Sequence, residues 1–179
     1  LVTLSDEECY SEKTMLDYSA GEITTEEARE LIQAVEEELH TDLLHFYAGV
    51  SYRHLLVWEG GSKNVNLTPP HDISDRKITD YLPKGEGAEK LLELMAQSEK
   101  ILKNHPVNQK RIAEGKNPAT SIWIWGEGSR PQLEKFESLY HKKGAVISAV
   151  DLIKGIAICA GMKSIDVPGA NGNYDTNYD

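Results

Sequence analysis

The sequence lacks the short motifs that mark common catalytic and metal centres. Its 179 residues include only two cysteines, Cys9 and Cys159, which lie far apart and form no Cys-x-x-Cys pair. This usage predicts reduced thiols in a cytosolic protein. HExxH, paired CxxC and EF-hand patterns are absent, so we expect no metal site within the chain. The GxxxxGKS/T phosphate loop and the GxSxG nucleophile elbow are absent too, which excludes those two motif classes.

Long apolar runs and excess positive charge are also missing. No apolar stretch is long enough to cross a membrane as a helix. The net charge of −10 argues against nucleic acid and anionic membranes as partners. A phosphorylated substrate is not excluded, because its site needs only a few local cations. Hydrophobic content of 40% and charged content of 27% are typical of a soluble globular domain, and a length of 179 residues favours a single domain.

The two ends of the sequence resemble internal positions of a longer protein. Residue 1 is leucine, and residues 1–4 have the pattern of a strand already under way. The last residues, 172–179, form a polar run with no helix or cap to close it. We therefore expect both ends to be cuts within a longer chain; a processed natural terminus is the alternative.

Helical and strand patterns alternate along the chain. Thr24 and Glu27 form a capping box before a helix whose apolar residues share one face. Further helices are predicted at residues 87–103, 106–115, 131–140 and 150–160, and strands at residues 1–4, 43–48, 52–59, 121–125 and 145–149. The early strands form an antiparallel hairpin, whereas the later ones alternate with helices. The predicted fold is therefore an α/β (α+β) sandwich with a mixed sheet flanked by helices.

The first candidate site is a loop of restricted flexibility at residues 68–72. Pro69 and Pro70 hold the backbone extended and remove two N–H donors. His71 and Asp72 follow directly, so they are presented from a stiff segment. The histidine can donate to an oxygen of a bound acid, and the aspartate can accept from a hydroxyl. The alternative is an aspartate that caps a turn beside a surface histidine.

The second candidate is Arg53, which precedes His54 in an otherwise apolar strand pattern. Strand alternation would place these two side chains on opposite faces. The planar guanidinium binds two oxygens of a carboxylate or phosphate at once. A salt bridge across the sheet, to Glu59 or Glu127, is an equal alternative for Arg53. For His54, a structural role is favoured.

The third candidate is a polar face on the short helix that Pro106 opens. His105, Asn108 and Arg111 are spaced by three residues, which places them on one face of that helix. His105 would lie at the helix start, where anions are favoured. The alternative is a basic helix whose side chains are exposed to solvent. Elsewhere, Trp125 could form the wall of a ligand site where the predicted strand 121–125 ends.

Six motifs, in a shared order along the chain, resemble those of one enzyme family. They occupy residues 17–21, 52–57, 69–73, 105–108 with Arg111, 147–155 and 175–178. Together with the strand 121–125, they resemble the archaeal-type cofactor-independent phosphoglycerate mutases of the alkaline-phosphatase-like superfamily. Each motif is weak alone, but their shared order covers nearly the whole chain.

The resemblance implies a fold and a division of labour. Residues 1–179 would form a substrate-binding domain inserted into a metal-binding phosphatase-like domain that this chain lacks, with Leu1 and Asp179 close together. The parent would interconvert 3-phosphoglycerate and 2-phosphoglycerate in the cytoplasm through a phosphoserine, using two divalent ions, Mn or Mg. The serine and the metal ligands would lie outside this chain, which alone would be inactive.

The resemblance also implies roles for the candidate residues. Arg53 or Arg111 would bind the glycerate carboxylate, while His71 and Asp72 would contact its hydroxyls; Asn108 and His105 complete the predicted set. The partners would be the two phosphoglycerates and the missing domain of the same protein. Three alternatives remain: a catalytically silent lid or oligomerisation insert, a homoserine kinase (a name also given to related sequences), and a phosphopentomutase-like relative.

Overall fold

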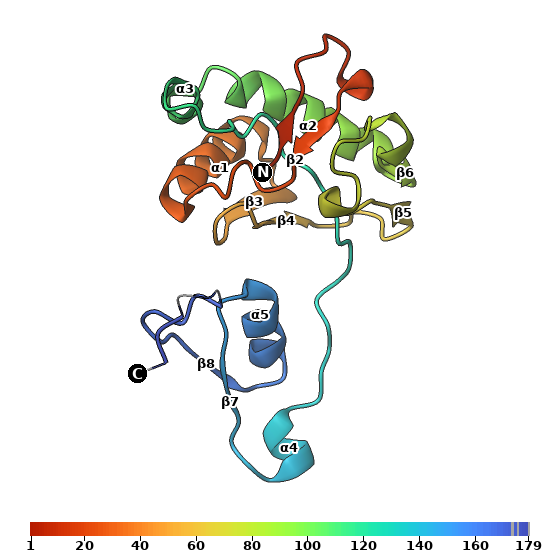
Figure 1. Ribbon diagram of the computed structural model, residues 1–179. Coiled ribbons are helices and arrows are strands. Elements are labelled where there is room, and N and C mark those ends of the chain that lie inside the picture. The colour runs from red at the N-terminus through yellow and green to blue at the C-terminus, as the bar shows by residue number, and fades with distance from the viewer. Residues whose placement is uncertain (173, 175, 179) are drawn as a thin grey trace. The chain divides into compact units, whose positions relative to one another are not determined.

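The chain is divided into two compact units, Leu1–Gly128 and Ser129–Asp179 (Figure 1). The computed structural model describes residues 1–172, 174 and 176–178. Each unit has helices and strands of its own. Among the described residues, no helix has the length and apolar character needed to cross a membrane.

Three helices organise the first unit: α1 (Thr25–Leu39), α2 (Ala88–Leu102) and α3 (Pro106–Ala113). All three occupy predicted positions. Thr24 accepts a hydrogen bond from the Glu27 amide, and the Glu27 carboxylate accepts from the Thr24 amide, so the predicted capping box is present. Helix α1 packs against both α2 and strand β3. The start of α1 is thereby fixed, and Glu27 is held at a defined place.

The strands of the first unit pair as three antiparallel two-stranded sheets. They are β1 (Thr3–Leu4) with β2 (Met15–Asp17), β3 (Leu44–Ala48) with β4 (His54–Trp58), and β5 (Val65–Asn66) with β6 (Lys84–Gly85). Single turns of 3₁₀ helix lie at η1 (Tyr10–Glu12), η2 (Pro70–Asp72) and η3 (Thr79–Tyr81). The predicted hairpin is confirmed, although β4 begins at His54 and leaves Arg53 in the turn.

The predicted strand at residues 121–125 is wrong. Only Ser121 forms a bridge, with Val2, and the residues after it run without a strand partner among the described residues. The apolar side chains there are nevertheless buried: Ile122 and Trp123 belong to the core, and the Trp123 indole donates to the Thr68 carbonyl at 2.8 Å. Burial by side-chain packing therefore produced a strand-like pattern without backbone pairing.

One core holds the first unit together. Its fully buried side chains come from α1, α2 and segments far apart in sequence, among them Met15, Ile23, Leu31, Leu44, Ile73, Ile78, Leu94, Met95 and Leu102. At about 25 cal/mol per Å² of apolar surface removed from water, this burial is the main stabilising term. Ile73 is 1% exposed and anchors the loop that carries His71 and Asp72.

The second unit consists of α4 (Phe136–Tyr140), β7 (Ala145–Ile147), α5 (Asp151–Cys159) and β8 (Lys163–Ile165). Strands β7 and β8 are parallel neighbours joined by α5. The predicted strand 145–149 and helix 150–160 are confirmed in position. The predicted helix 131–140 is shorter than expected: its first half is irregular and exposed, because Leu133 there has no core to pack against.

The α/β class is confirmed, but the arrangement of strands differs from the expected single mixed sheet. The described strands form four two-stranded sheets, three antiparallel and one parallel. Asp179 lies outside the described residues, so the proximity of the two termini stays a prediction. The prediction that residues 1–179 constitute one inserted domain also stays a prediction.

Glu36 ties the C-terminal part of α1 to strand β3, and this contact generates a pH-dependent prediction. Its carboxylate accepts from the Phe46 amide and from His45 Nδ1, the latter at 2.9 Å. Partial burial raises the pKa of Glu36, but these hydrogen bonds and the charges of His45 and His40 outweigh burial and hold the pKa below its ordinary value of 4.5. The contribution to stability is therefore present above pH 4.5 and is lost as pH falls through the folded-state pKa.

Glu36→Gln in the 179-residue chain should lower the free energy of unfolding by about 1 kcal/mol at pH 7. The difference from wild type should shrink as pH falls below 4.5, measured by urea unfolding at a series of pH values. Glu38→Gln, an exposed change on the same helix, is the matched control and should have little effect. A constant difference between pH 3 and pH 7 would contradict this role for Glu36.

Candidate functional site

His71 and Asp72 are displayed on the surface of the first unit by the 3₁₀ turn η2. Pro70 opens this turn and is buried, and Ile73 closes it in the core. The two candidate side chains are exposed: His71 is 48% exposed and Asp72 is 63% exposed. His71 Nε2 and Asp72 Oδ1 are 3.8 Å apart. Pro69 is extended as predicted, but Pro70 begins a 3₁₀ turn, so the expectation of an extended backbone at both prolines is wrong.

The ring of His71 belongs to a row of aromatic contacts. It meets Trp125 edge-on at a centroid distance of 5.3 Å and Tyr18 edge-on at 6.2 Å. Tyr18 in turn meets Tyr52 edge-on at 5.8 Å. Edge-to-face geometry in this distance range is the favoured arrangement of aromatic pairs. Four separate segments of the first unit thus meet in a continuous row of ring contacts.

Arg53 extends this row at the end formed by Tyr52. Its guanidinium carbon lies 4.3 Å from the Tyr52 ring centroid, and Nη2 donates to the Tyr52 hydroxyl at 2.7 Å. The side chain is exposed. A guanidinium that stacks on a ring retains its other N–H donors for an anion. We call Tyr18, Tyr52, Arg53, His71 and Trp125 the Tyr18 cluster.

Two predicted ligands, Arg53 and His71, are therefore linked through the rings of Tyr52 and Tyr18, and Asp72 lies beside His71. Tyr18 and Tyr52, which join them, were not predicted as site residues. Their positions in the sequence could have identified them, because each lies inside one of the family-like motifs, at residues 17–21 and 52–57. Burial raises the pKa of the Tyr52 phenol above its ordinary value, so the hydroxyl stays neutral near pH 7.

The third predicted group occupies a buried face of α3. His105 caps the helix, with its Nδ1 accepting from the Val107 amide at 3.3 Å. Asn108 donates to the carbonyls of Leu102 and Ala119 at 2.9 and 2.8 Å and accepts from the Ala119 amide. The shared face is as predicted, but it faces the protein. The side-chain amide of Asn108 and the ring nitrogen of His105 therefore form hydrogen bonds with backbone groups of this chain.

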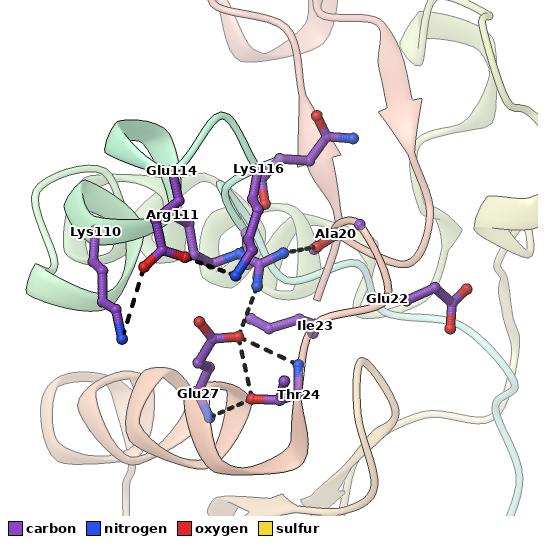
Figure 2. A network of polar contacts seen from close by, with 12 residues as sticks. Ala20, Glu22, Ile23, Thr24, Glu27, Lys110, Arg111, Glu114 and Lys116 are labelled. Carbon is purple, nitrogen blue, oxygen red and sulfur yellow. Dashed lines mark hydrogen bonds and ion pairs between the residues drawn. The ribbon is translucent and has the colours of Figure 1, made fainter.

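Arg111 is 2% exposed, and all three of its side-chain nitrogens donate within the protein. Figure 2 shows the contacts with Glu27 and Ala20. Nη1 binds Glu27 Oε2 at 2.7 Å, Nη2 binds the Ala20 carbonyl at 2.6 Å, and Nε binds the Asn117 carbonyl at 2.9 Å. Arg111 is therefore buried, whereas Arg53 is exposed. The sequence pattern had predicted both as possible carboxylate ligands.

His54 has the structural role that the sequence favoured. Its Nδ1 accepts from the Gly49 amide at 3.2 Å, and its Nε2 is a buried nitrogen without a hydrogen-bond partner in the part of the chain described. No three His, Cys, Asp or Glu side chains of the described residues are grouped as metal ligands would be. In the second unit, Lys154 binds Asp166 at 2.7 Å.

Sequence comparison now identifies the family. The profile of 2,3-bisphosphoglycerate-independent phosphoglycerate mutase matches residues 1–108. The chain belongs to this family. It is 53% identical to a probable phosphoglycerate mutase of this type from Geobacter sulfurreducens and 53% identical to one from Methanosarcina barkeri. The two alignments cover 92% and 91% of this chain but only 41% of each relative, so the chain spans less than half the length of these mutases.

Solved structures show the same fold. A cofactor-independent phosphoglycerate mutase from Thermoplasma acidophilum superimposes with a TM-score of 0.60 at 22% identity, covering 94% of this chain and 46% of that one. A protein from Pyrococcus horikoshii superimposes with a TM-score of 0.59 at 25% identity, covering 88% of this chain and 37% of that one. The profile match and the curated relatives confirm the family resemblance inferred from the motifs.

The buried ring of His54 generates a prediction about titration. Burial, together with the amino group of Leu1, lowers the pKa of His54 to about 3 from an ordinary value of 6.5. The unfolded chain therefore binds more protons between these two values, and the contribution of His54 to stability falls as pH drops from 6.5 toward 3. In the folded 179-residue chain, NMR should show no titration of this ring between pH 5 and pH 8. A titration midpoint near pH 6.5 for His54 in the folded chain, like the one expected for the chain unfolded in urea, would contradict this prediction.

Proposed function

We propose that the chain is part of a longer phosphoglycerate mutase that interconverts 3-phosphoglycerate and 2-phosphoglycerate in the cytoplasm without bisphosphoglycerate. The observation that carries this proposal is the family match, with 53% identity over nearly the whole chain to mutases of this type. The first unit supplies surface side chains that bind and orient the glycerate. The transfer of the phosphoryl group belongs to residues outside this chain.

The Tyr18 cluster with Asp72 is the proposed glycerate site. The Arg53 guanidinium suits a carboxylate because two of its N–H groups can donate to both oxygens at once. His71 can donate to an oxygen of the substrate, and Asp72 can accept from a glycerate hydroxyl. Tyr18 and Trp125 hold the His71 ring between them. Arg111, Asn108 and His105 then support the site from within the fold, because their polar atoms bind the protein itself.

The metal ions implied by the family do not fit the described residues, which contain no cluster of metal ligands. We assign the two divalent ions, Mn or Mg, and the phosphoserine to the remainder of the longer protein. The net charge of −10 makes nucleic acid an unsuitable partner. The site in this chain therefore acts by binding and orientation.

The proposed site leads to a kinetic prediction for the full-length protein supplied with manganese and no bisphosphoglycerate. Wild type should convert 3-phosphoglycerate, as followed by coupled enolase absorbance. Arg53→Ala and His71→Ala should each lower kcat/KM by at least about tenfold, because each removes a charge-assisted or hydrogen-bonding contact worth about 1.5–3 kcal/mol.

Arg29→Ala is the matched control, since Arg29 is an exposed arginine on α1 outside the cluster. It should retain wild-type kcat/KM. No conversion by wild type would overturn the mutase proposal. Full activity of both cluster variants would preserve the mutase and remove the glycerate site from this surface. Phosphate release, phosphopentose turnover or homoserine phosphorylation in place of conversion would favour the alternative enzyme classes.

The second unit has the features of a surface that the rest of the longer protein covers. A parallel sheet is normally covered on both faces, and two strands alone are marginally stable. Yet α5 leaves Leu152 69% exposed and Ile158 60% exposed, and Ile147 on β7 is 59% exposed. The mutases that match this chain are more than twice as long. We therefore propose that the remaining phosphatase-like domain packs on α5, β7 and β8.

The proposed packing predicts that one substitution has different effects in the two lengths of protein. Leu152→Asp should change the stability of the 179-residue chain by less than about 0.5 kcal/mol, as for a surface site. In the full-length protein it should destabilise by more than about 2 kcal/mol, because it buries an unpaired charge. Urea unfolding of both proteins measures these effects. Lys142→Asp, an exposed change in the same unit, is the control in each. Equal effects of Leu152→Asp in the two proteins would contradict the proposal, and a concentration-dependent effect in the short chain would favour an oligomer contact.

A further inference from the structure

Arg111 links the turn that follows its own helix to two neighbouring segments near the start of the chain, and one of them carries Tyr18. The guanidinium reaches Glu27 at the start of α1 and the Ala20 carbonyl in the loop between β2 and α1 (Figure 2). It also reaches the Asn117 carbonyl after α3. The contacts with Glu27 and Ala20 span 84 and 91 residues of sequence. We call residues 17–23 the Tyr18 loop.

The Tyr18 loop has a conformation that needs external support. Ala20, Gly21 and Glu22 all have positive φ values, of 50°, 68° and 51°. For the two residues with a side chain, this left-handed conformation costs about 1–2 kcal/mol each. Such conformations persist where the surroundings fix them, and they cluster at functional sites. The Ala20 carbonyl that accepts from Arg111 lies at the start of this strained run.

Asp17 provides the second support of the loop. Its carboxylate accepts from the Ser19 amide and hydroxyl, from the Gly21 amide and from the Asn117 side chain, all at 2.7–2.8 Å. Burial raises the pKa of Asp17, but these hydrogen bonds outweigh burial and hold the pKa below its ordinary value. A side chain at Gly21 would stand 3.2 Å from Arg111 Nη2. The loop is therefore packed directly onto the guanidinium.

Glu27 keeps the guanidinium in place. A buried guanidinium without a counter-charge is strongly destabilising, and Glu27 supplies that charge at 2.7 Å. The same carboxylate completes the capping box with Thr24. Its pKa is held below the ordinary value because the Arg111 charge and the Thr24 hydrogen bonds outweigh the effect of burial. The helix start thus fixes the position of Arg111, and Arg111 fixes the loop.

From this geometry we infer that Arg111 is a positioning residue for the Tyr18 cluster. By holding the Ala20 carbonyl, it sets the place of the Tyr18 ring, which contacts both His71 and Tyr52. The inference rests on the proposed function, because the cluster is the proposed glycerate site. Arg111 itself touches no substrate: its effect passes through Tyr18.

The kinetic test uses Arg111→Lys, Tyr18→Ala and the double variant of the full-length protein. Lysine retains the charge for Glu27 but cannot reach Glu27, Ala20 and Asn117 together. Arg111→Lys should raise KM for 3-phosphoglycerate about tenfold. Tyr18→Ala should raise it similarly, and Arg111→Lys should add less than about twofold in the Tyr18→Ala background, since residues that act as one unit are non-additive.

The control is another buried ion pair of the first unit. Lys13 is 2% exposed and binds Glu99 at 2.8 Å. Lys13→Gln should lower the melting temperature, as Arg111→Lys does, but leave KM within about twofold of wild type. An equal rise in KM for Lys13→Gln would mean that general destabilisation explains the effect and would overturn the inference.

A second readout is independent of catalysis. In the 179-residue chain, Arg111→Lys should speed amide hydrogen exchange in the Tyr18 loop and shift the ring NMR signals of His71, while Lys13→Gln should not. If wild type shows no mutase activity, the proposed function fails and this readout still decides the role of Arg111. Unchanged exchange and His71 signals, or fully additive KM effects with Tyr18→Ala, would overturn the inference.

Discussion

The buried ion pair between Arg111 and Glu27 is the constraint on which the first unit depends. A guanidinium that is 2% exposed needs a counter-charge and acceptors for its N–H groups. Glu27, Ala20 and Asn117 provide them, so the start of α1, the Tyr18 loop and the turn after α3 have fixed relative positions. The same carboxylate caps α1. One charge pair thus couples helix initiation to the geometry of a surface loop.

The candidate site is assembled from loops, each of which has its own buried anchor. Ile73 anchors the turn that displays His71 and Asp72. Trp123 anchors the segment that carries Trp125, because its indole donates to the Thr68 carbonyl. Arg111 anchors the loop that carries Tyr18. Exposed polar groups are thereby held by a rigid interior, which is the usual way in which binding loops keep a defined geometry. The edge-to-face rings then join the loops to one another.

Local signals predicted much of this structure. The capping box at Thr24, the start of α3 at Pro106 and the β3–β4 hairpin follow from short-range chemistry and are present. Predictions failed where the outcome depended on distant partners, as the expected single mixed sheet did. The run at residues 121–125 is buried by side chains without pairing as a strand, and the first half of the helix predicted at residues 131–140 lacks a core to pack against.

By itself, the sequence determined the family, the order of most elements, and the presence of His71 and Asp72 on a stiff loop. It did not distinguish Arg53 from Arg111, since both are arginines in family-like motifs with a carboxylate as their natural partner. The tertiary structure made that distinction. Arg53 is exposed over a tyrosine ring, whereas Arg111 is buried against a glutamate 84 residues away. Burial is a property of long-range packing, and no local pattern of residue types encodes it.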